Sequence, residues 1–160
     1  MVRLFICILL VLATAALGQS RIQKDRRRLS FLRRTLDGLA VLEGEIRAYA
    51  APLPTAFLRA GAACPLFSAA ARLLDTQDAE TAFLKALRTE NVQNAEAEIF
   101  ESFALGLLSE DAEGQLANIR RTAKRITVLS EKLAGDTART ARLYGSGGVL
   151  FGIALVILLI

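Results

Sequence analysis

The end of the chain constrains its fold most, because residues 143–160 (LYGSGGVLFGIALVILLI) carry no charged side chain. A helix rises 1.5 Å per residue, so about 18 residues span roughly 27 Å, close to the hydrocarbon thickness of a bilayer. A helix also satisfies its own backbone hydrogen bonds, for which lipid offers no partners. A buried helix of a soluble domain is the rival interpretation, but a surface helix would show a polar stripe. We therefore predict a C-terminal membrane segment over residues 143–160.

A second uncharged run, LFICILLVLATAAL, occupies residues 4–17. About 14 residues is short for a membrane span, and a secretory signal peptide cleaved before Gln19 is the rival interpretation. The flanking charges favour an uncleaved anchor, because seven Lys and Arg residues stand between positions 21 and 34 and only Arg3 precedes the run. Basic residues beside a membrane segment stay on the cytoplasmic side. We predict an N-terminal membrane segment over residues 1–18 and a cytoplasmic helical domain over residues 19–142.

Apolar residues recur at spacings of three and four along two stretches, which predicts two long amphipathic helices. The first stripe consists of Leu29, Leu32, Leu36, Leu39, Leu42 and Ile46, and the second of Leu116, Ile119, Ala123, Ile126, Leu129 and Leu133. Pro52 and Pro54 end the first helix, since proline lacks an N–H and disfavours helix in the residue before it. The second helix begins after Ser109-Glu110-Asp111 and meets only Gly135 as a breaker before the C-terminal segment.

Shorter helices are predicted between the two long ones. Pro54 opens one that reaches Ala60, and another runs from Pro65 to Leu73. Asp78 is the expected N-cap of the next, with Phe83, Leu84 and Leu87 facing inward. A fifth covers Val92 to Leu107. The predicted fold is all-α: a membrane-anchored helical bundle with two long amphipathic helices, several short helices between them, and a hydrophobic helix at each end.

Residues able to perform catalysis are scarce in this sequence. It contains no histidine, the commonest general base and metal ligand. Cys64 has no base to activate it and is expected to be a packing residue, and Cys7 lies in the N-terminal apolar run. Glu43 and Glu45 are two residues apart on a helix and therefore point in different directions. We predict no enzymatic activity, no catalytic residues, no cofactor and no small-molecule substrate.

Two further patterns resemble ligand sites. Glu96, Glu98 and Glu101 could hold a cation, but a solvated helix face is the favoured interpretation, so no metal site is predicted. The glycine-rich GSGG at 145–148 lacks the lysine of a phosphate-binding loop. Gly148 and Gly152 have the spacing of a GxxxG motif, and we predict that they pack membrane helices together.

Two basic clusters are candidates for binding. Arg26-Arg27-Arg28 fits a topology determinant, an anionic-lipid contact or a nucleic-acid patch; no aromatic residues interleave with it, which favours the membrane interpretations, and we predict no nucleic-acid binding. The second cluster lies off the apolar stripe of the last long helix and consists of Arg120, Arg121, Lys124 and Arg125. A solvated surface and lipid contact are its alternatives. Arg121 lies roughly 33 Å before Leu143 along an unbroken upright helix, beyond the Debye length of about 8 Å. We predict that this cluster docks an acidic protein surface.

Several blocks in their order and spacing give the sequence a family resemblance. These blocks are LEGEI at 42–46 followed by Pro52-Leu53, LFS at 66–68, TAFLKAL at 81–87, the spacing of Asp111, Gln115 and Ile119, and Ser146, Gly148 and Gly152 near the end. The chain resembles the stage III sporulation protein AB family over nearly its whole length. It departs from that pattern at Ala48, where a tyrosine is expected, and at Leu108 and Gly145, where a glycine and a basic residue are usual. Contacts made at these three positions do not carry over.

The resemblance implies a helical domain similar to the cytoplasmic domains of the platform protein in type II secretion and type IV pilus systems. It implies a location in the mother-cell membrane around the forespore, with the soluble domain in the cytoplasm. The expected function is a non-enzymatic structural adaptor of the mother cell–forespore channel needed for endospore formation. Expected partners are other stage III sporulation membrane proteins and a secretion-type ATPase, and self-association into a homo-oligomer is left open. The alternative is a platform-like inner-membrane component of a type II secretion or type IV pilus-like system.

Overall fold

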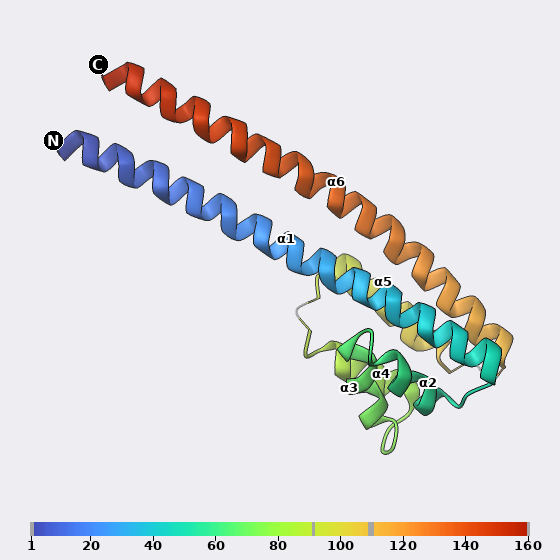
Figure 1. Cartoon of the computed structure of the whole chain (residues 1–160). Coiled ribbons are helices and arrows are strands. Elements are labelled where there is room, and N and C mark those ends of the chain that lie inside the picture. The colour runs from blue at the N-terminus through green and yellow to red at the C-terminus, as the bar shows by residue number, and fades with distance from the viewer. Residues whose placement is uncertain (1, 91, 109–110, 160) are drawn as a thin grey trace. The chain divides into compact units, whose positions relative to one another are not determined.

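The protein is all-helical throughout the described residues (Figure 1). The computed structural model describes the backbone of residues 2–90, 92–108 and 111–159, and the side chains of residues 22–90, 92–108 and 111–141. The helices are α1 (Val2–Tyr49), α2 (Leu53–Ala60), α3 (Pro65–Leu73), α4 (Ala79–Leu87), α5 (Asn94–Gly106) and α6 (Ala112–Leu159). The predictions of an all-α fold and of two long helices, with several short ones between them in the sequence, are confirmed.

The chain divides into two compact units. One consists of Met1–Ser30 with Glu131–Ile160, and the other is Phe31–Ser130. Within the described residues, no helix has a stretch long and apolar enough to cross a membrane. The predicted membrane segments, residues 1–18 and 143–160, and the glycines Gly148 and Gly152 lie outside the residues whose side chains are described. The membrane predictions and the boundaries of the predicted domain at 19 and 142 therefore stay predictions.

The apolar stripe predicted for α1 forms its buried face. Leu32, Leu39, Leu42 and Ile46 are buried, while Leu29 and Leu36 are half-buried. Thr35 is also buried, which the stripe does not predict. Its hydroxyl donates to the carbonyl of Phe31 at 3.0 Å, so the helix itself satisfies this polar group.

The stripe predicted for α6 is only partly correct. Ile119 and Ile126 are buried as expected, but Leu116, Ala123, Leu129 and Leu133 are half-buried. The remaining buried positions of α6 are polar: Asn118, Thr122, Ser130 and Thr137. Ser130 and Thr137 donate to carbonyls of their own helix at 2.8 and 2.7 Å, which lowers the free-energy cost of burying a hydroxyl. The buried face of α6 therefore lies to one side of its apolar stripe and includes polar residues, which a prediction from apolar residues alone misses.

The helix boundaries follow from local sequence signals. Helix α2 begins at Leu53, one residue before the prediction, with Pro54 in its first turn, and α3 begins at Pro65 as predicted. The Asp78 carboxylate accepts the Thr81 N–H at 3.4 Å and caps α4 as predicted. Each of these residues satisfies or removes a backbone donor that the first helical turn leaves without a partner.

The last two helices begin with side-chain caps as well. Glu96 accepts the Gln93 N–H at 3.1 Å at the start of α5, and Asp111 accepts the Gly114 N–H at 2.9 Å where α6 begins. Val92 lies just before α5 rather than within it, because the helix starts only after this cap.

A cluster of phenylalanine rings forms the core of the Phe31–Ser130 unit. Phe83 is fully buried and lies 5.0 Å from the ring of Phe103, with three further rings within 6.3 Å. Those three belong to Phe57, Phe67 and Phe100. Phe83 thus joins α4 to α2, α3 and α5, which confirms its predicted place in the core. Leu84 is half-buried rather than inward-facing, since it lies about 100° around the helix from Phe83.

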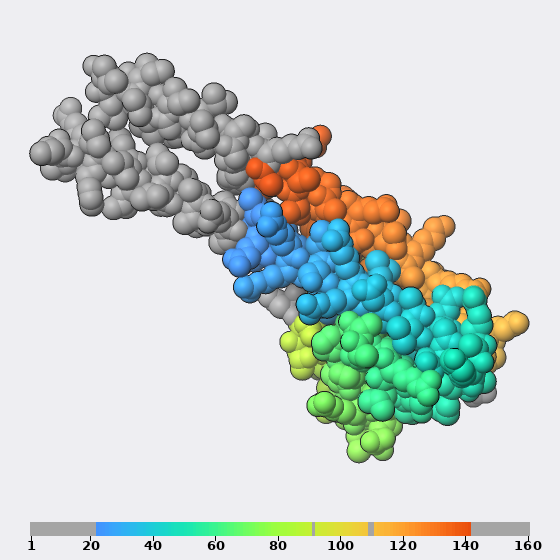
Figure 2. Space-filling model, viewed as in Figure 1, coloured from blue at the N-terminus to red at the C-terminus, as the bar shows by residue number. Residues whose placement is uncertain are grey.

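Helices α2, α3 and α4 gather against the second half of α1 (Figures 1 and 2). The closest approach is at Gly38, where a Cβ atom would lie 2.5 Å from the Phe67 ring and 3.1 Å from the Cβ of Cys64. The absent side chain lets α3 pack directly on the backbone of α1. These short helices do not separate the two long ones, because α1 and α6 make direct contact through Glu43 and Arg120.

Candidate interaction surface

The basic cluster predicted for docking lies on the second long helix, α6. Its members form two rows along the helix, Arg120 with Lys124 and Arg121 with Arg125. The two residues of each row are one helical turn apart. Arg120, Arg121 and Lys124 are exposed, and Arg125 is half-buried. The structure therefore places all four on the outer part of α6, but it gives them different surroundings.

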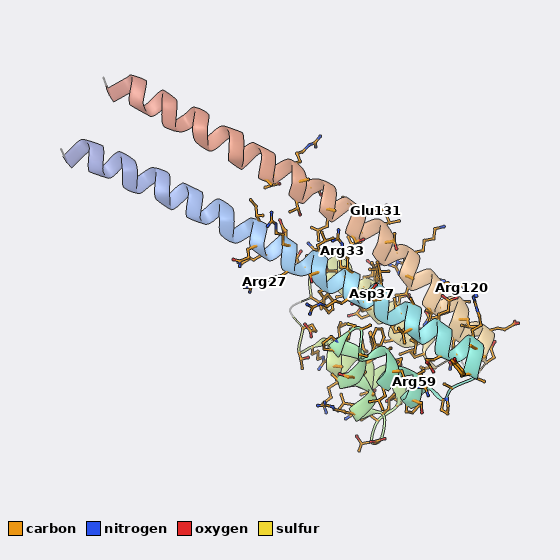
Figure 3. The ribbon with its side chains drawn as sticks, in the orientation of Figure 1. Arg27, Arg33, Asp37, Arg59, Arg120 and Glu131 are labelled. Atoms are coloured by element: carbon orange, nitrogen blue, oxygen red, sulfur yellow. The ribbon has the colours of Figure 1, made fainter. Side chains whose placement is uncertain are left out.

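Arg120 is tied to α1. Its Nε donates to Oε1 of Glu43 at 2.9 Å, and the Arg47 guanidinium, one turn along α1, donates to the same oxygen at 2.6 Å. Figure 3 labels Arg120 beside the C-terminal end of α1. Because Glu43 is only 26% exposed, its carboxylate is better shielded than a free surface acid. Arg120 thus holds α6 against α1.

Arg125 is tied to α5. Its Nη2 donates to Oε1 of Glu98 at 3.1 Å. Closer to the turn between the two helices, Asn118 Nδ2 donates to the carbonyl of Phe103 at 2.9 Å. These contacts fix α6 against α5, and the half-buried Arg125 belongs to that junction rather than to a free surface.

The other two basic side chains have no ion pair among the described residues. Arg121 and Lys124 are exposed, and one turn after Lys124 stands Val128, which is 61% exposed. We call these three residues the α6 outer strip. It combines positive charges that no described side chain neutralises with an apolar side chain in water. The structure narrows the predicted docking cluster to this strip, and docking itself stays a prediction.

The neighbouring helix α5 presents an exposed face of different composition. Of its three glutamates, Glu96 is buried as a helix cap and Glu98 binds Arg125, whereas Glu101 is exposed. Among the described residues no three potential ligand side chains gather closely enough to hold a metal ion. One turn after Glu101 stands Leu105, which is 58% exposed, and Leu108, two residues past the end of α5, is 53% exposed. We call Glu101, Leu105 and Leu108 the α5 outer strip, which the sequence pattern did not single out as a surface.

The corner between α1 and α2 is held by a third ion pair. Arg59 Nη1 donates to Glu45 Oε2 at 2.7 Å, and its guanidinium carbon lies 5.9 Å from the centre of the Tyr49 ring. Figure 3 labels Arg59 on α2. Glu45 therefore points to α2 while Glu43 points to α6. This confirms that the two carboxylates face in different directions.

Cys64 is a packing residue, as predicted. It is 1% exposed, and its Sγ lies 3.7 Å from the hydroxyl oxygen of Thr35. It sits where α3 begins, against the close approach of α3 to Gly38.

The fold and this surface define a protein class: an all-α domain bounded by two long helices, in which Arg121 and Lys124 of the basic cluster have no ion pair among the described residues. The family model of stage III sporulation protein AB matches residues 3–160, so the chain belongs to the stage III sporulation protein AB family. This confirms the family resemblance recognised in the sequence.

A solved structure titled "Stage III sporulation protein AB" is similar to this chain in fold. The TM-score is 0.60 at 23% sequence identity, and the match covers 68% of this chain and 94% of the solved chain. At this identity the likeness is evidence for the fold alone. No curated protein sequence matches the chain significantly.

Proposed function

We propose that the protein is a non-enzymatic structural adaptor of the mother cell–forespore channel complex needed for endospore formation. The observation that carries this proposal is the match of a sporulation protein family to residues 3–160, nearly the whole chain. One feature of the structure supports an adaptor: the ion pairs Arg59–Glu45, Arg120–Glu43 and Arg125–Glu98 join helices of the same chain, whereas Arg121 and Lys124 have no ion pair among the described residues.

The adaptor is anchored in the mother-cell membrane by residues 1–18 and 143–160, with its helical domain in the cytoplasm. The two uncharged runs and the basic residues after the first support this topology. Arg26 and Arg27 are exposed, as a charge cluster beside a membrane requires.

A reporter inserted between Asp75 and Thr76 tests the topology, because both residues are exposed in the turn between α3 and α4. A cytoplasmic signal, together with a mature chain that begins at residue 1, is the expected result. An extracytoplasmic signal, or a mature chain that begins at Gln19, contradicts it.

The partners are other stage III sporulation membrane proteins and a secretion-type ATPase, and docking uses an acidic protein surface opposite the α6 outer strip. Charge supports this choice: Arg121 and Lys124 have no described carboxylate to neutralise them, and opposite charges across an interface favour association.

The test reverses both charges in one variant, Arg121→Glu with Lys124→Glu. Its matched control is Arg72→Glu with Lys85→Glu, which makes the same change of net charge at exposed positions of α3 and α4. We expect the α6 variant to retain its helicity but to lose partner co-purification and sporulation, while the control retains both. If the two variants show the same partner co-purification and the same sporulation, the α6 outer strip is an ordinary solvated surface that docks no partner.

A further inference from the structure

The outer strips of α5 and α6 are complementary to each other. The α6 strip offers Arg121 and Lys124, and the α5 strip offers Glu101 followed by two exposed leucines. Glu101, Arg121 and Lys124 have no ion pair in the described part of the chain. We propose that the acidic surface docked by the α6 outer strip is the α5 outer strip of a second copy of this chain. This inference rests on the proposed function only in taking the α6 strip as a protein-docking surface.

The register between the two helices sets which residues would meet. Asn118 contacts Gly106 near the turn that joins the helices, and Arg125 pairs with Glu98 further away from it, so α5 and α6 run antiparallel. Counting from the pair of Glu98 and Arg125 toward that turn places Glu101 level with Thr122, the residue next to Arg121. Glu101 and Arg121 therefore lie within about 1.5 Å of the same height on neighbouring helices.

The two side chains do not pair within one chain because they point away from the junction. Glu101 lies about 60° around α5 from Glu98, and Arg121 lies about 40° around α6 from Arg125. Glu98 and Arg125 face each other, whereas Glu101 and Arg121 are both exposed, so both rotations lead outward into solvent. An opposite charge supplied from outside the chain can reach each of them.

A dimer with a two-fold axis parallel to these helices brings an opposite charge to both residues, once in each copy. The rotation lays α5 of one copy over α6 of the other and keeps each residue at its own height. Glu101 of each copy then faces Arg121 of the other, with Lys124 less than one turn away. Such an interface is isologous and closes as a dimer, since the same patch is used on both copies.

The same rotation brings a large apolar side chain close to a small one. Counted from the pair of Glu98 and Arg125, Leu105 is level with Asn118, one residue from Ala117, which lies one turn before Arg121 on the same face of α6. Leu105 is 58% exposed, and Ala117 is exposed as well. Burial of Leu105 against Ala117 adds to the charge attraction and excludes water from the interface.

The test uses two copies of the full-length chain that carry different affinity tags, are produced in the same cells and are extracted in mild detergent. One variant is Glu101→Arg and the other is Arg121→Glu. In a homotypic pair of either variant, both contacts across the two-fold axis join like charges. In the mixed pair, both contacts join opposite charges, because each variant keeps the residue that the other has lost.

We expect wild-type copies to co-purify, each homotypic variant pair to recover at least about tenfold less of the second copy, and the mixed pair to recover the wild-type amount. Circular dichroism of each variant checks that helicity is unchanged. Loss of association in all three variant pairings, undiminished association in the homotypic pairs, or no association of wild-type copies overturns the dimer. If Arg121→Glu with Lys124→Glu still abolishes partner capture and sporulation in that case, the acidic surface belongs to another protein and the proposed function stands.

Discussion

Arg120 on α6 donates a hydrogen bond to Glu43 on α1 across 2.9 Å, although the two residues are 77 positions apart in the chain. Glu43 also accepts from Arg47 through the same oxygen, so one carboxylate joins a local pair to a long-range one. With the pair of Arg125 and Glu98, this contact fixes α6 against two different helices. The basic cluster on α6 is therefore divided between structural and free side chains.

This division predicts that neighbouring substitutions on α6 differ in how much they destabilise the fold. Arg120→Gln and Arg125→Gln each remove an exposed or half-exposed ion pair and should lower the free energy of unfolding by up to about 1 kcal/mol. Arg121→Gln removes no described ion pair and should change it by less than about 0.5 kcal/mol. Urea unfolding of the three variants measures the difference. An equal loss in all three would show that the ion pairs contribute nothing specific.

The ring cluster predicts a much larger effect at its centre. Phe83→Ala removes a fully buried ring surrounded by four others and should cost about 3–5 kcal/mol. Phe31 is only half-buried and packs edge-on against Phe100, so Phe31→Ala serves as a control with a smaller loss. Thermal unfolding monitored by circular dichroism compares them. Equal melting temperatures for the two variants would contradict the central place of Phe83.

Two glycines of α1 provide a matched pair. At Gly44 a Cβ atom would meet nothing within 4 Å, so Gly44→Ala should stabilise the fold by about 1 kcal/mol through helix propensity. At Gly38 the same atom would lie 2.5 Å from the buried Phe67 ring, and overpacking of about 1–3 kcal/mol opposes that gain. Gly38→Ala should therefore be the less stable variant in urea unfolding. Equal stabilisation at both sites would contradict the close packing at Gly38, because it would mean that α3 can shift away from α1 with no loss of free energy of unfolding.

The residue directly after α1 has a strained backbone. Ala50 has φ 45°, in the left-handed region that glycine adopts more readily than alanine. Ala50→Gly should raise the free energy of unfolding by about 0.5–1 kcal/mol, because relief of that strain exceeds the entropy that glycine adds to the unfolded chain. Ala40→Gly, at an exposed position in the middle of α1, is the control and should lower it by about 1 kcal/mol. A loss at both positions would contradict the left-handed conformation.

The cap of α4 predicts a dependence on pH. Hydrogen bonding to Thr81 lowers the pKa of the Asp78 carboxyl in the folded chain, outweighing the opposite effect of desolvation. A carboxyl with a lowered folded-state pKa stabilises the fold above its unfolded pKa, and this contribution is lost as the pH falls through the folded value.

Asp78→Ala should therefore melt at a lower temperature than the wild type at neutral pH. The difference should shrink as the solution is acidified and the folded carboxyl takes up its proton. Melting curves from neutral to acidic pH measure it, with Asp75→Ala as a control at an exposed acid in the turn between α3 and α4. A difference that stays constant across this range would rule out the charged cap.

The sequence alone determined the helices and most of their boundaries. Apolar spacing identified α1 and α6, Pro65 marked the first residue of α3, and Asp78 marked the cap of α4. These signals act within about one helical turn, because hydrogen bonds, caps and side-chain neighbours in a helix join residues no more than four positions apart. For the same reason the cluster of basic residues on α6 was visible in the sequence.

Only the tertiary structure decided what these side chains contact. The partners of Arg120 and Arg125 come from α1 and α5, and no local pattern encodes which helices lie side by side or in what register. The same holds for the polar buried face of α6, and for the difference between Gly38, against Phe67, and the open Gly44. Packing between helices depends on the fit of whole surfaces, so a residue's partner is fixed only when the chain has folded.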